Sequence, residues 1–522
     1  MSQIARDTKA PSLGFLLFGN LLAWWLAAII ANANLDGYGD MLETFTWGQR
    51  WNWSNFKHPP LSGWVAALWF DLFPHNDAFY YLLSCVIVVA GVAGVVLLAR
   101  QWLSAERRWL AALMLLLAFP YSTLAYKFNA NAILLLTWPW AAYFFARSLH
   151  HRQWWATVGL GLFGALAMLG KYYSGLLLVT FFLASLLTPS GRSWYKTPHP
   201  YAAGGIFLLA MIPHMQWVFH HDFVTFKYVE EQGEGYVDYS QIVRFFFAPL
   251  LYWGIPWLLT LWTCYEGPFW RRAVDSVSWK GADDLLFWLC VLPWLISLIF
   301  GISGFVALSL PWAIPIGFAY SILWLRNATA TQKIGLATAR FRRILPGYFV
   351  AVVLLVGVAY AVIQARNGSE NYYLPRKEFT AEVMSRWQQR HPDIRLGWVG
   401  GEWAANGMIP FYGDASIIAI PNVPDQFPAT IAPLKDWQTM GGVMICVDGP
   451  AQHPPGAQDC RKPIETWLHD KGQPSEGEAI IVQRTGVRFP KPQAWRYWAY
   501  WYVPTQITES HPKAGVNPAS AP

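Results

Sequence analysis

Three carboxylates follow the first long apolar stretch of the chain. Asp36, Asp40 and Glu43 lie in the segment NLDGYGDMLE, directly after the apolar residues 12–31. An ionisable side chain at the end of a membrane-spanning stretch is costly and marks a functional site by default. A carboxylate there can act as a general base, which takes the proton of an attacking group. For Asp36 we favour this role over the alternative, a loop acid that is simply exposed to water.

Asp40 and Glu43 fit two roles equally well. If residues 40–53 form a helix, the two carboxylates share one face of it, where they can contact a substrate. Acidic residues also stabilise the N-terminal end of a helix without any substrate. The residues alone leave both roles open.

A lysine and a histidine precede a rigid turn in the same predicted loop. Lys57 and His58 come directly before Pro59 and Pro60, and this proline pair fixes the direction of the chain. A cation held at the level of the lipid headgroups, in the same loop as an acid, is a natural partner for a phosphate. The equally supported alternative is a lysine that extends along the membrane surface to reach water.

Two further predicted outer loops carry side chains that suit a phosphorylated ligand. Lys127 is a second candidate for a phosphate contact. Asn129 and Asn131 in the same loop can hydrogen-bond a hydroxyl group but cannot accept a proton. Lys171 and Tyr172 fall at the outer end of a predicted helix, where a tyrosine is often only an interface anchor.

A fourth predicted outer loop contains side chains of the types that bind divalent cations. These are His220, His221, Asp222, Glu230, Glu231 and Glu234. Their spacing matches no metal-binding motif. We therefore expect no required cofactor and leave a divalent cation as an open alternative.

The composition places these loops on a multi-span α-helical membrane protein. Hydrophobic residues make up 55% of the 522 residues and charged residues only 13%, against about 25% charged residues in soluble domains. Two pieces, 41–53 and 61–73, predict helices that lie in the membrane interface. About eleven apolar stretches approach the length that spans a bilayer: 12–31, 78–99, 109–126, 132–149, 154–169, 174–189, 202–220, 243–263, 284–302, 305–324 and 346–364.

The distribution of Lys and Arg predicts the orientation of these spans. With the N-terminus inside, most basic residues fall on segments that face the cytoplasm and few fall in the short outer loops. This asymmetry follows the positive-inside rule and puts the C-terminus outside. It also accounts for the net charge of +7, so no nucleic-acid partner is required. The first apolar stretch exceeds the roughly 7–15 residues of a signal-peptide core, which predicts an uncleaved helix.

Beyond the last span the composition becomes that of a soluble domain. Helix-like segments alternate with strand-like segments such as 394–401 and 441–448, which predicts a small α/β domain. We expect a membrane domain at 1–365, with interfacial helices in its first outer loop at 32–77, an outer domain at 366–508 and a disordered tail at 509–522. Cys446 and Cys460 in the outer domain form either a disulfide or two free thiols.

The first outer loop also resembles a known family. The segments DGYGDMLE at 36–43 and WGQRWNWSNFKHPPLSGW at 47–64 look like the first periplasmic loop of the bacterial GT-C glycosyltransferases related to protein O-mannosyltransferases and to the lipid A aminoarabinose transferase. The resemblance implies a polyprenyl-phosphate-linked sugar as donor, membrane lipids around the protein, and a periplasmic C-terminal domain on a bacterial inner membrane. It further implies a lipid A, lipopolysaccharide, glycolipid or protein acceptor.

The resemblance also implies roles for individual residues. Asp36 would be the base, and Lys57 would offset the charge on the departing phosphate in a single inverting displacement. Asp40 and Glu43 would orient the sugar or the acceptor. Several relatives carry an acid where this chain has Asn129 and Asn131, which argues against a two-acid mechanism. The competing classes are a secondary transporter and a non-catalytic polysaccharide-assembly protein.

Overall fold

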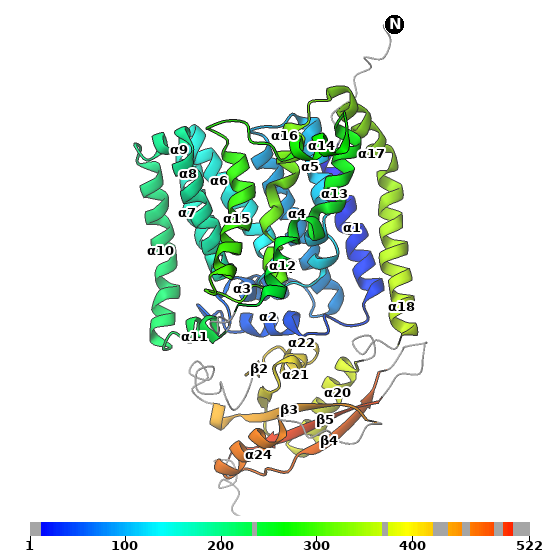
Figure 1. Ribbon diagram of the computed structural model, residues 1–522. Coiled ribbons are helices and arrows are strands. Elements are labelled where there is room, and N and C mark those ends of the chain that lie inside the picture. The colour runs from blue at the N-terminus through cyan, green and yellow to red at the C-terminus, as the bar shows by residue number, and fades with distance from the viewer. Residues whose placement is uncertain are drawn as a thin grey trace, which may run out of the picture. The chain divides into compact units, whose positions relative to one another are not determined.

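The computed structural model divides the chain into two compact units (Figure 1). It describes residues 12–231, 237–367, 374–420, 437–451, 460–484 and 494–504. The first unit comprises the described parts of 1–36 and 50–367, and the second comprises 37–49 and the described parts of 368–522. The first unit is helical, and the second combines helices with a sheet.

Long apolar helices form the first unit. Among the described residues, six helices are long and apolar enough to cross a membrane: Leu13–Ala31 (α1), Asp77–Ala99 (α4), His199–His220 (α10), Tyr239–Cys264 (α12 and α13), Leu285–Ile302 (α15) and Thr331–Arg366 (α17, η6 and α18). Lipid offers no hydrogen-bond partners to the backbone, and a helix satisfies these bonds within itself. The multi-span helical architecture is therefore confirmed, and the count of eleven spans stays a prediction.

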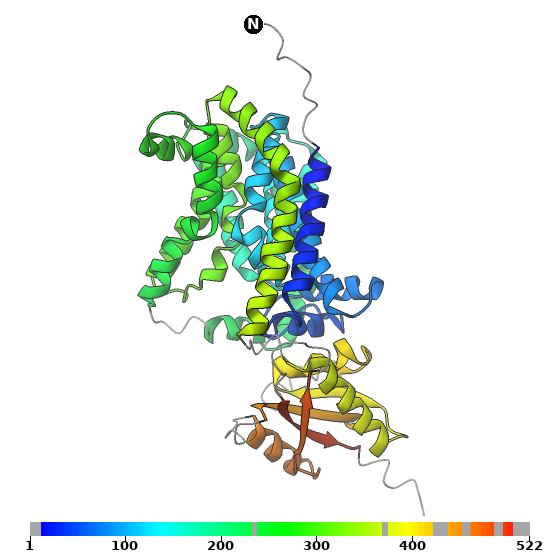
Figure 2. The same ribbon diagram turned by 90° about the vertical axis from the view of Figure 1, so that its right-hand side faces the viewer.

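Side-chain contacts join the first and last of these helices. Figure 2 shows the segment Thr331–Arg366 beside α1. The indole nitrogen of Trp24 donates a hydrogen bond of 3.2 Å to the hydroxyl oxygen of Tyr348. Trp24, Ala23 and Ala27 of α1 pack in one apolar cluster with Val352. Two segments far apart in sequence thus form one wall of the bundle.

Other predicted spans are shorter or broken. Helices α6 (Leu134–His151), α7 (Trp154–Gly170) and α8 (Gly175–Leu187) cover three of them. Residues 109–126 are bent by 86° between α5 (Ala105–Leu116) and the 3₁₀ turns of Phe119–Tyr126.

Prolines explain the breaks in the apolar segments. Pro120 lies in the bend of 109–126, and Pro311 and Pro315 lie where residues 310–319 form two 3₁₀ turns, η4 and η5, before α16 (Tyr320–Asn327). Proline lacks the N–H that continues a helix. Apolar length alone therefore overestimates the number of straight spans.

Two short helices follow α1 in the chain. Helices α2 (Asp40–Gly48) and α3 (Leu61–Leu72) form where interfacial helices were predicted. Helix α2 is grouped with the second unit. There the ring of Phe45 lies edge-on to Phe411 at 5.1 Å, and Gln49 Oε1 accepts a hydrogen bond of 3.1 Å from Ala419 N. No feature of the sequence predicted this grouping.

A five-stranded sheet forms the second unit, in the order β2-β1-β3-β5-β4. Its strands are β1 (Leu396–Gly401), β2 (Ile418–Ala419), β3 (Gly441–Pro450), β4 (Glu478–Gln483) and β5 (Ala494–Tyr502). Strand β1 pairs in parallel with β2 and β3, and β5 pairs antiparallel with β3 and β4. Helices α20 (Arg376–Arg390) and α24 (Arg461–Asp470) accompany it. The small C-terminal α/β unit is confirmed.

Cys446 and Cys460 form a disulfide, which the sequence had left open. It joins β3 to the residue before α24, with the two Cα atoms 5.8 Å apart. A loop of this length constrains the unfolded chain by about 3 kcal/mol. We expect the double change Cys446→Ala and Cys460→Ala to lower the stability of the second unit by about that amount, measured as urea-dependent protease resistance. A reductant should lower the protease resistance of the wild type by the same amount and leave that of the double variant unchanged. If the wild type, the reduced wild type and the double variant resist protease equally, the prediction is wrong.

Candidate functional site

The carboxylate of Asp36 faces a lysine from another loop. Lys127 Nζ lies 3.6 Å from Asp36 Oδ2, and the two side chains are 33% and 10% exposed. Asp36 follows the end of α1, and Lys127 follows the 3₁₀ turn η2 (Thr123–Tyr126). The sequence proposed both residues as site candidates without pairing them.

Helix α4 holds both loops that supply this pair. The hydroxyl of Tyr81 donates a hydrogen bond of 2.6 Å to the backbone oxygen of Asn34. The hydroxyl of Ser84, three residues along the same helix, donates one of 2.9 Å to the backbone oxygen of Tyr126. One rigid element thus positions the residues that precede Asp36 and Lys127.

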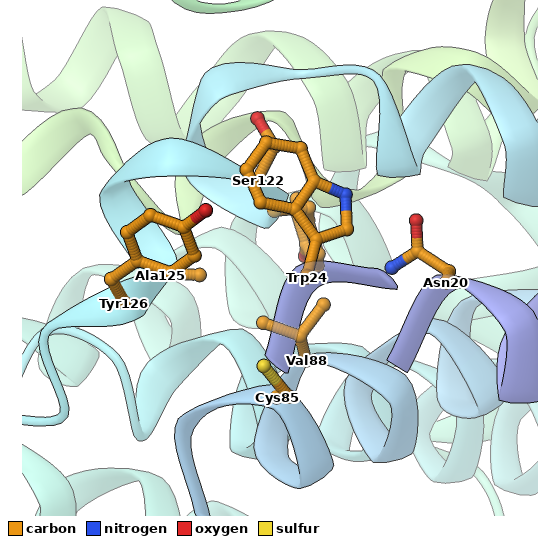
Figure 3. Close-up of a pocket in the computed structure, with 8 residues that line it drawn as sticks. Asn20, Trp24, Cys85, Val88, Ser122, Ala125 and Tyr126 are labelled. Atoms are coloured by element: carbon orange, nitrogen blue, oxygen red, sulfur yellow. The ribbon is translucent and has the colours of Figure 1, made fainter. Parts of the chain in front are cut away.

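A small, mostly apolar cavity lies beside the bend that precedes Lys127. Figure 3 shows Asn20 and Trp24 from α1, Cys85 and Val88 from α4, and Ser122, Ala125 and Tyr126 from the bent segment around it. Its volume of about 10 Å³ is that of a single water site at most. It is therefore too small to hold a sugar or a polyprenyl chain.

Three basic side chains gather at a second place in the first unit. Burial lowers the pKa of His58 well below its ordinary value, and the positive charges of Lys171 and Lys57 lower this pKa further. His58 is therefore neutral at physiological pH, while both lysines act on it electrostatically. Lys57 and His58 were predicted together in one loop and Lys171 in another, and in the structure the charge of Lys171 acts on His58.

Lys171 is the most deeply buried of these candidates, with only 9% of the residue exposed. Its Nζ donates a hydrogen bond of 2.7 Å to Asn131 Oδ1 and lies 5.2 Å from the ring centroid of Trp312. Both contacts orient the ammonium group. Such a group attracts an anion strongly, because little water screens it.

Asn129 has a structural role in the loop that runs from Lys127, the partner of Asp36, to Asn131, the partner of Lys171. Its Oδ1 accepts hydrogen bonds from the backbone N–H groups of Asn131 (2.9 Å) and Ala132 (3.1 Å), as a helix cap does. The turn it caps leads into α6. Lys127 and Asn131 are four residues apart, so their Cα atoms lie within about 14 Å of each other.

Replacing Asn129 tests this capping role. We expect Asn129→Ala to lower the free energy of unfolding by about 1 kcal/mol, which is the usual loss when a cap is removed. Asn129→Asp should stay within a few tenths of wild type, because a carboxylate accepts the same bonds and its charge suits a helix N-terminus. Denaturant titration of the purified variants measures both values. If Asp destabilises as much as Ala, the side chain is not a cap.

Tyr172 belongs to a hydrogen-bonded chain that sequence reasoning missed. The backbone oxygen of Trp53 can only accept, so His214 Nδ1 donates to it at 2.6 Å and His214 Nε2 accepts from the Tyr172 hydroxyl at 2.9 Å. His214 is fully buried in α10. Its position within the predicted apolar span 202–220 was the available signal, since buried ionisable residues in spans are rarely accidental.

Helix α11 (Val224–Glu231) supports the loop that carries Lys57. The hydroxyl of Thr225 donates a hydrogen bond of 2.9 Å to the backbone oxygen of Asn55 and lies 3.2 Å from the hydroxyl oxygen of Ser54. The ring centroid of Tyr228 is 6.2 Å from that of His58. Because α11 contacts the loop at successive turns, it fixes the position of the basic residues.

Two further candidates belong to the second unit. Asp40 and Glu43 lie in the first turn of α2, in the second unit, and their contact with a substrate stays a prediction. Within the described residues, no three His, Cys, Asp or Glu side chains are placed to hold a metal ion. Glu234 of the predicted cation-binding loop lies outside the described residues.

Comparison with known proteins finds a family match for part of the sequence and a similar fold for nearly the whole chain. Residues 57–217 match the family model of dolichyl-phosphate-mannose-protein mannosyltransferase. The structure is similar to that of ArnT from Cupriavidus metallidurans bound to undecaprenyl phosphate, with a TM-score of 0.55 and 17% identity over 93% of this chain and 97% of that chain. The chain has the fold of the GT-C glycosyltransferases.

This GT-C fold agrees with a second structure of the same relative. ArnT from Cupriavidus metallidurans in the apo state gives a TM-score of 0.52 and 15% identity over 94% of this chain and 97% of that chain. No curated protein matches the sequence. The resemblance that residues 36–64 suggested is thus confirmed for the fold of nearly the whole chain.

Proposed function

We propose that this protein is a glycosyltransferase that takes a sugar from a polyprenyl-phosphate donor. The observation that supports it best is the arrangement at one end of the first unit. There a carboxylate that is 10% exposed faces Lys127, and Lys57, His58 and Lys171 gather nearby in the same unit. An acid for proton transfer and a basic cluster for a phosphate are the two parts that such a reaction requires.

The proposed reaction is a single displacement. The acceptor hydroxyl oxygen attacks the anomeric carbon of the sugar and loses its proton to Asp36 as the new C–O bond forms. The bond between the anomeric carbon and the phosphate oxygen breaks, and its electron pair leaves with the phosphate. Inversion at the anomeric carbon follows from this single step, with no covalent intermediate on the enzyme.

The basic residues act on the leaving group. Negative charge grows on the phosphate oxygen as the bond breaks, and fixed positive charges stabilise that change most where water is scarce. Lys171 is nearly buried, and Lys57 acts on the same histidine. Lys127 holds the Asp36 carboxylate in place and is a further phosphate contact. Asp40 and Glu43 orient the sugar or the acceptor.

The relatives support the class of donor but not the acceptor. ArnT from Cupriavidus metallidurans was crystallised with undecaprenyl phosphate, so a polyprenyl-phosphate carrier suits a chain of this fold. We place the reaction at the outer face of a bacterial inner membrane, with the N-terminus in the cytoplasm and the C-terminal unit in the periplasm. The acceptor is a lipid A, lipopolysaccharide, glycolipid or protein group.

A transfer assay tests the proposal directly. Purified protein in lipid is incubated with a panel of radiolabelled polyprenyl-phosphate sugars and a membrane extract as the source of acceptors. We expect label to move to a new product with at least one donor, and that donor identifies the sugar. A folded protein that transfers no label from any donor, but moves a solute in proteoliposomes, would instead be a transporter.

A further inference from the structure

A second, polar pocket lies at the end of the bundle opposite to Asp36. Its volume is about 510 Å³, and it is lined by the last turns of α4 and α6 and the residues that follow α4. Helix α4 begins near the loop of Asp36 and runs for 23 residues, which is about 34 Å. The pocket is therefore one membrane thickness away from the proposed sugar-transfer site and is separate from it.

Basic side chains dominate the lining of this pocket. Arg100 and Arg147 contribute guanidinium groups, and His150 and His151 contribute imidazoles. Asp283 acts electrostatically on His150, and its Oδ1 accepts hydrogen bonds from the backbone N–H and the hydroxyl group of Ser190. The pocket thus carries a net positive charge and suits an anion.

Two donor atoms in the lining are buried without a protein partner. Among the described residues, Gln101 Nε2 and Arg147 Nε have no hydrogen-bond acceptor. The rest of the Arg147 side chain is held firmly: its terminal nitrogen donates to Gln153 Oε1 at 2.7 Å, and its guanidinium lies 5.6 Å from the ring centroid of Trp155. A buried donor without an acceptor is costly, and both side chains belong to the lining of the pocket.

Aromatic residues mark the level of the pocket in the membrane. Trp102 and Tyr143 belong to its lining, and Trp154 and Trp155, at the start of α7, are 56% and 50% exposed. Tryptophan and tyrosine concentrate at the headgroup level of bilayers. By the distribution of basic residues, this end of the bundle faces the cytoplasm. The pocket therefore opens where the headgroups of inner-leaflet lipids lie.

We propose that this pocket binds a phosphate-bearing anion, and that the phosphodiester headgroup of an anionic phospholipid supplies it. Basic pockets between helices on the cytoplasmic side recognise such headgroups. A pocket of this volume is large enough for a headgroup, and the arginine fork matches phosphate oxygens. The lipid would tie α4 and α6 together at the end remote from Asp36.

Native mass spectrometry of the detergent-solubilised protein tests this site. We expect phosphatidylglycerol to stay bound where phosphatidylcholine does not, and the double change Arg100→Gln and Arg147→Gln to weaken phosphatidylglycerol binding by at least about 10-fold. The matched control is Arg271→Gln with Arg272→Gln, which removes two arginines from α14 (Phe269–Ser276) and should leave binding unchanged. Equal binding of both lipids, or equal loss in both double variants, overturns the proposal.

Two further arms use the wild-type protein, so they hold even if a variant misfolds. A photoactivatable phosphatidylglycerol should crosslink to peptides that contain residues 97–102 or 143–151, and crosslinks confined to other peptides contradict the site. Glycerol 3-phosphate at millimolar concentration should not displace the lipid. If it does, the phosphate site stands but its source is a soluble anion, and the lipid assignment is wrong.

Discussion

Replacing Asp36 by asparagine is expected to lower the rate of sugar transfer by about 10²- to 10⁴-fold, which is the usual contribution of a general base. Asparagine keeps the size of the side chain and still offers an oxygen to Lys127, which lies 3.6 Å from the carboxylate in the wild type. It cannot accept a proton from the acceptor hydroxyl. Initial rates with a radiolabelled donor at saturation measure the effect.

A matched acid provides the control for Asp36. Asp71 in α3 is exposed and belongs to the same unit, so Asp71→Asn makes the same charge change away from the pair. Its transfer rate should equal that of wild type. Unfolding midpoints of both variants should also stay near that of wild type. Full activity in Asp36→Asn would remove this residue from the role of base.

Replacing Lys171 by methionine is expected to weaken the binding of a polyprenyl phosphate by about 10- to 100-fold. A hydrogen bond to a charged group contributes about 1.5–3 kcal/mol, and the nearly buried position of Lys171 leaves little water to screen it. Methionine keeps the unbranched chain that packs near Trp312 and removes only the charge and its donors. A titration with undecaprenyl phosphate, followed as the dissociation constant, gives the result.

Two other lysines show whether the effect is local. Lys57→Ala should weaken the same binding by a smaller factor, because Lys57 is only half-buried. Lys196→Met changes an exposed lysine beyond α9 (Pro189–Trp194) and should change nothing. If the dissociation constant is unaltered in both Lys171→Met and Lys57→Ala, the phosphate contact moves to Lys127 or another cation.

Local patterns in the sequence predicted the multi-span helical architecture and the small C-terminal α/β unit. Apolar runs such as 78–99 predict spans because membrane-crossing length is a property of consecutive residues. Asp36 and the basic residues before the proline pair at 59–60 lie in the same predicted outer loop. The sequence alone therefore shows that this loop carries both an acid and a base. The strand-like segments 394–401 and 441–448 likewise form β1 and β3.

The partners of these residues were decided by the tertiary structure. Lys171 meets Asn131 across 40 positions of sequence, and His214 meets the backbone of Trp53 across 161. Such contacts depend on how the helices pack, and the spacing of residues within one segment does not specify that packing. The same holds for the grouping of α2 with the C-terminal unit and for the disulfide between Cys446 and Cys460.

The bend before Lys127 shows both contributions at once. Pro120 in the sequence signals a break, because it cannot donate the hydrogen bond that continues a helix. Its direction follows from packing, since Ser84 of α4 binds the backbone oxygen of Tyr126 and holds the turned segment. The sequence by itself contains the signal for this break, although we predicted 109–126 as one span. Only the tertiary structure decided that the chain then presents Lys127 to Asp36, because that contact needs two helices in place.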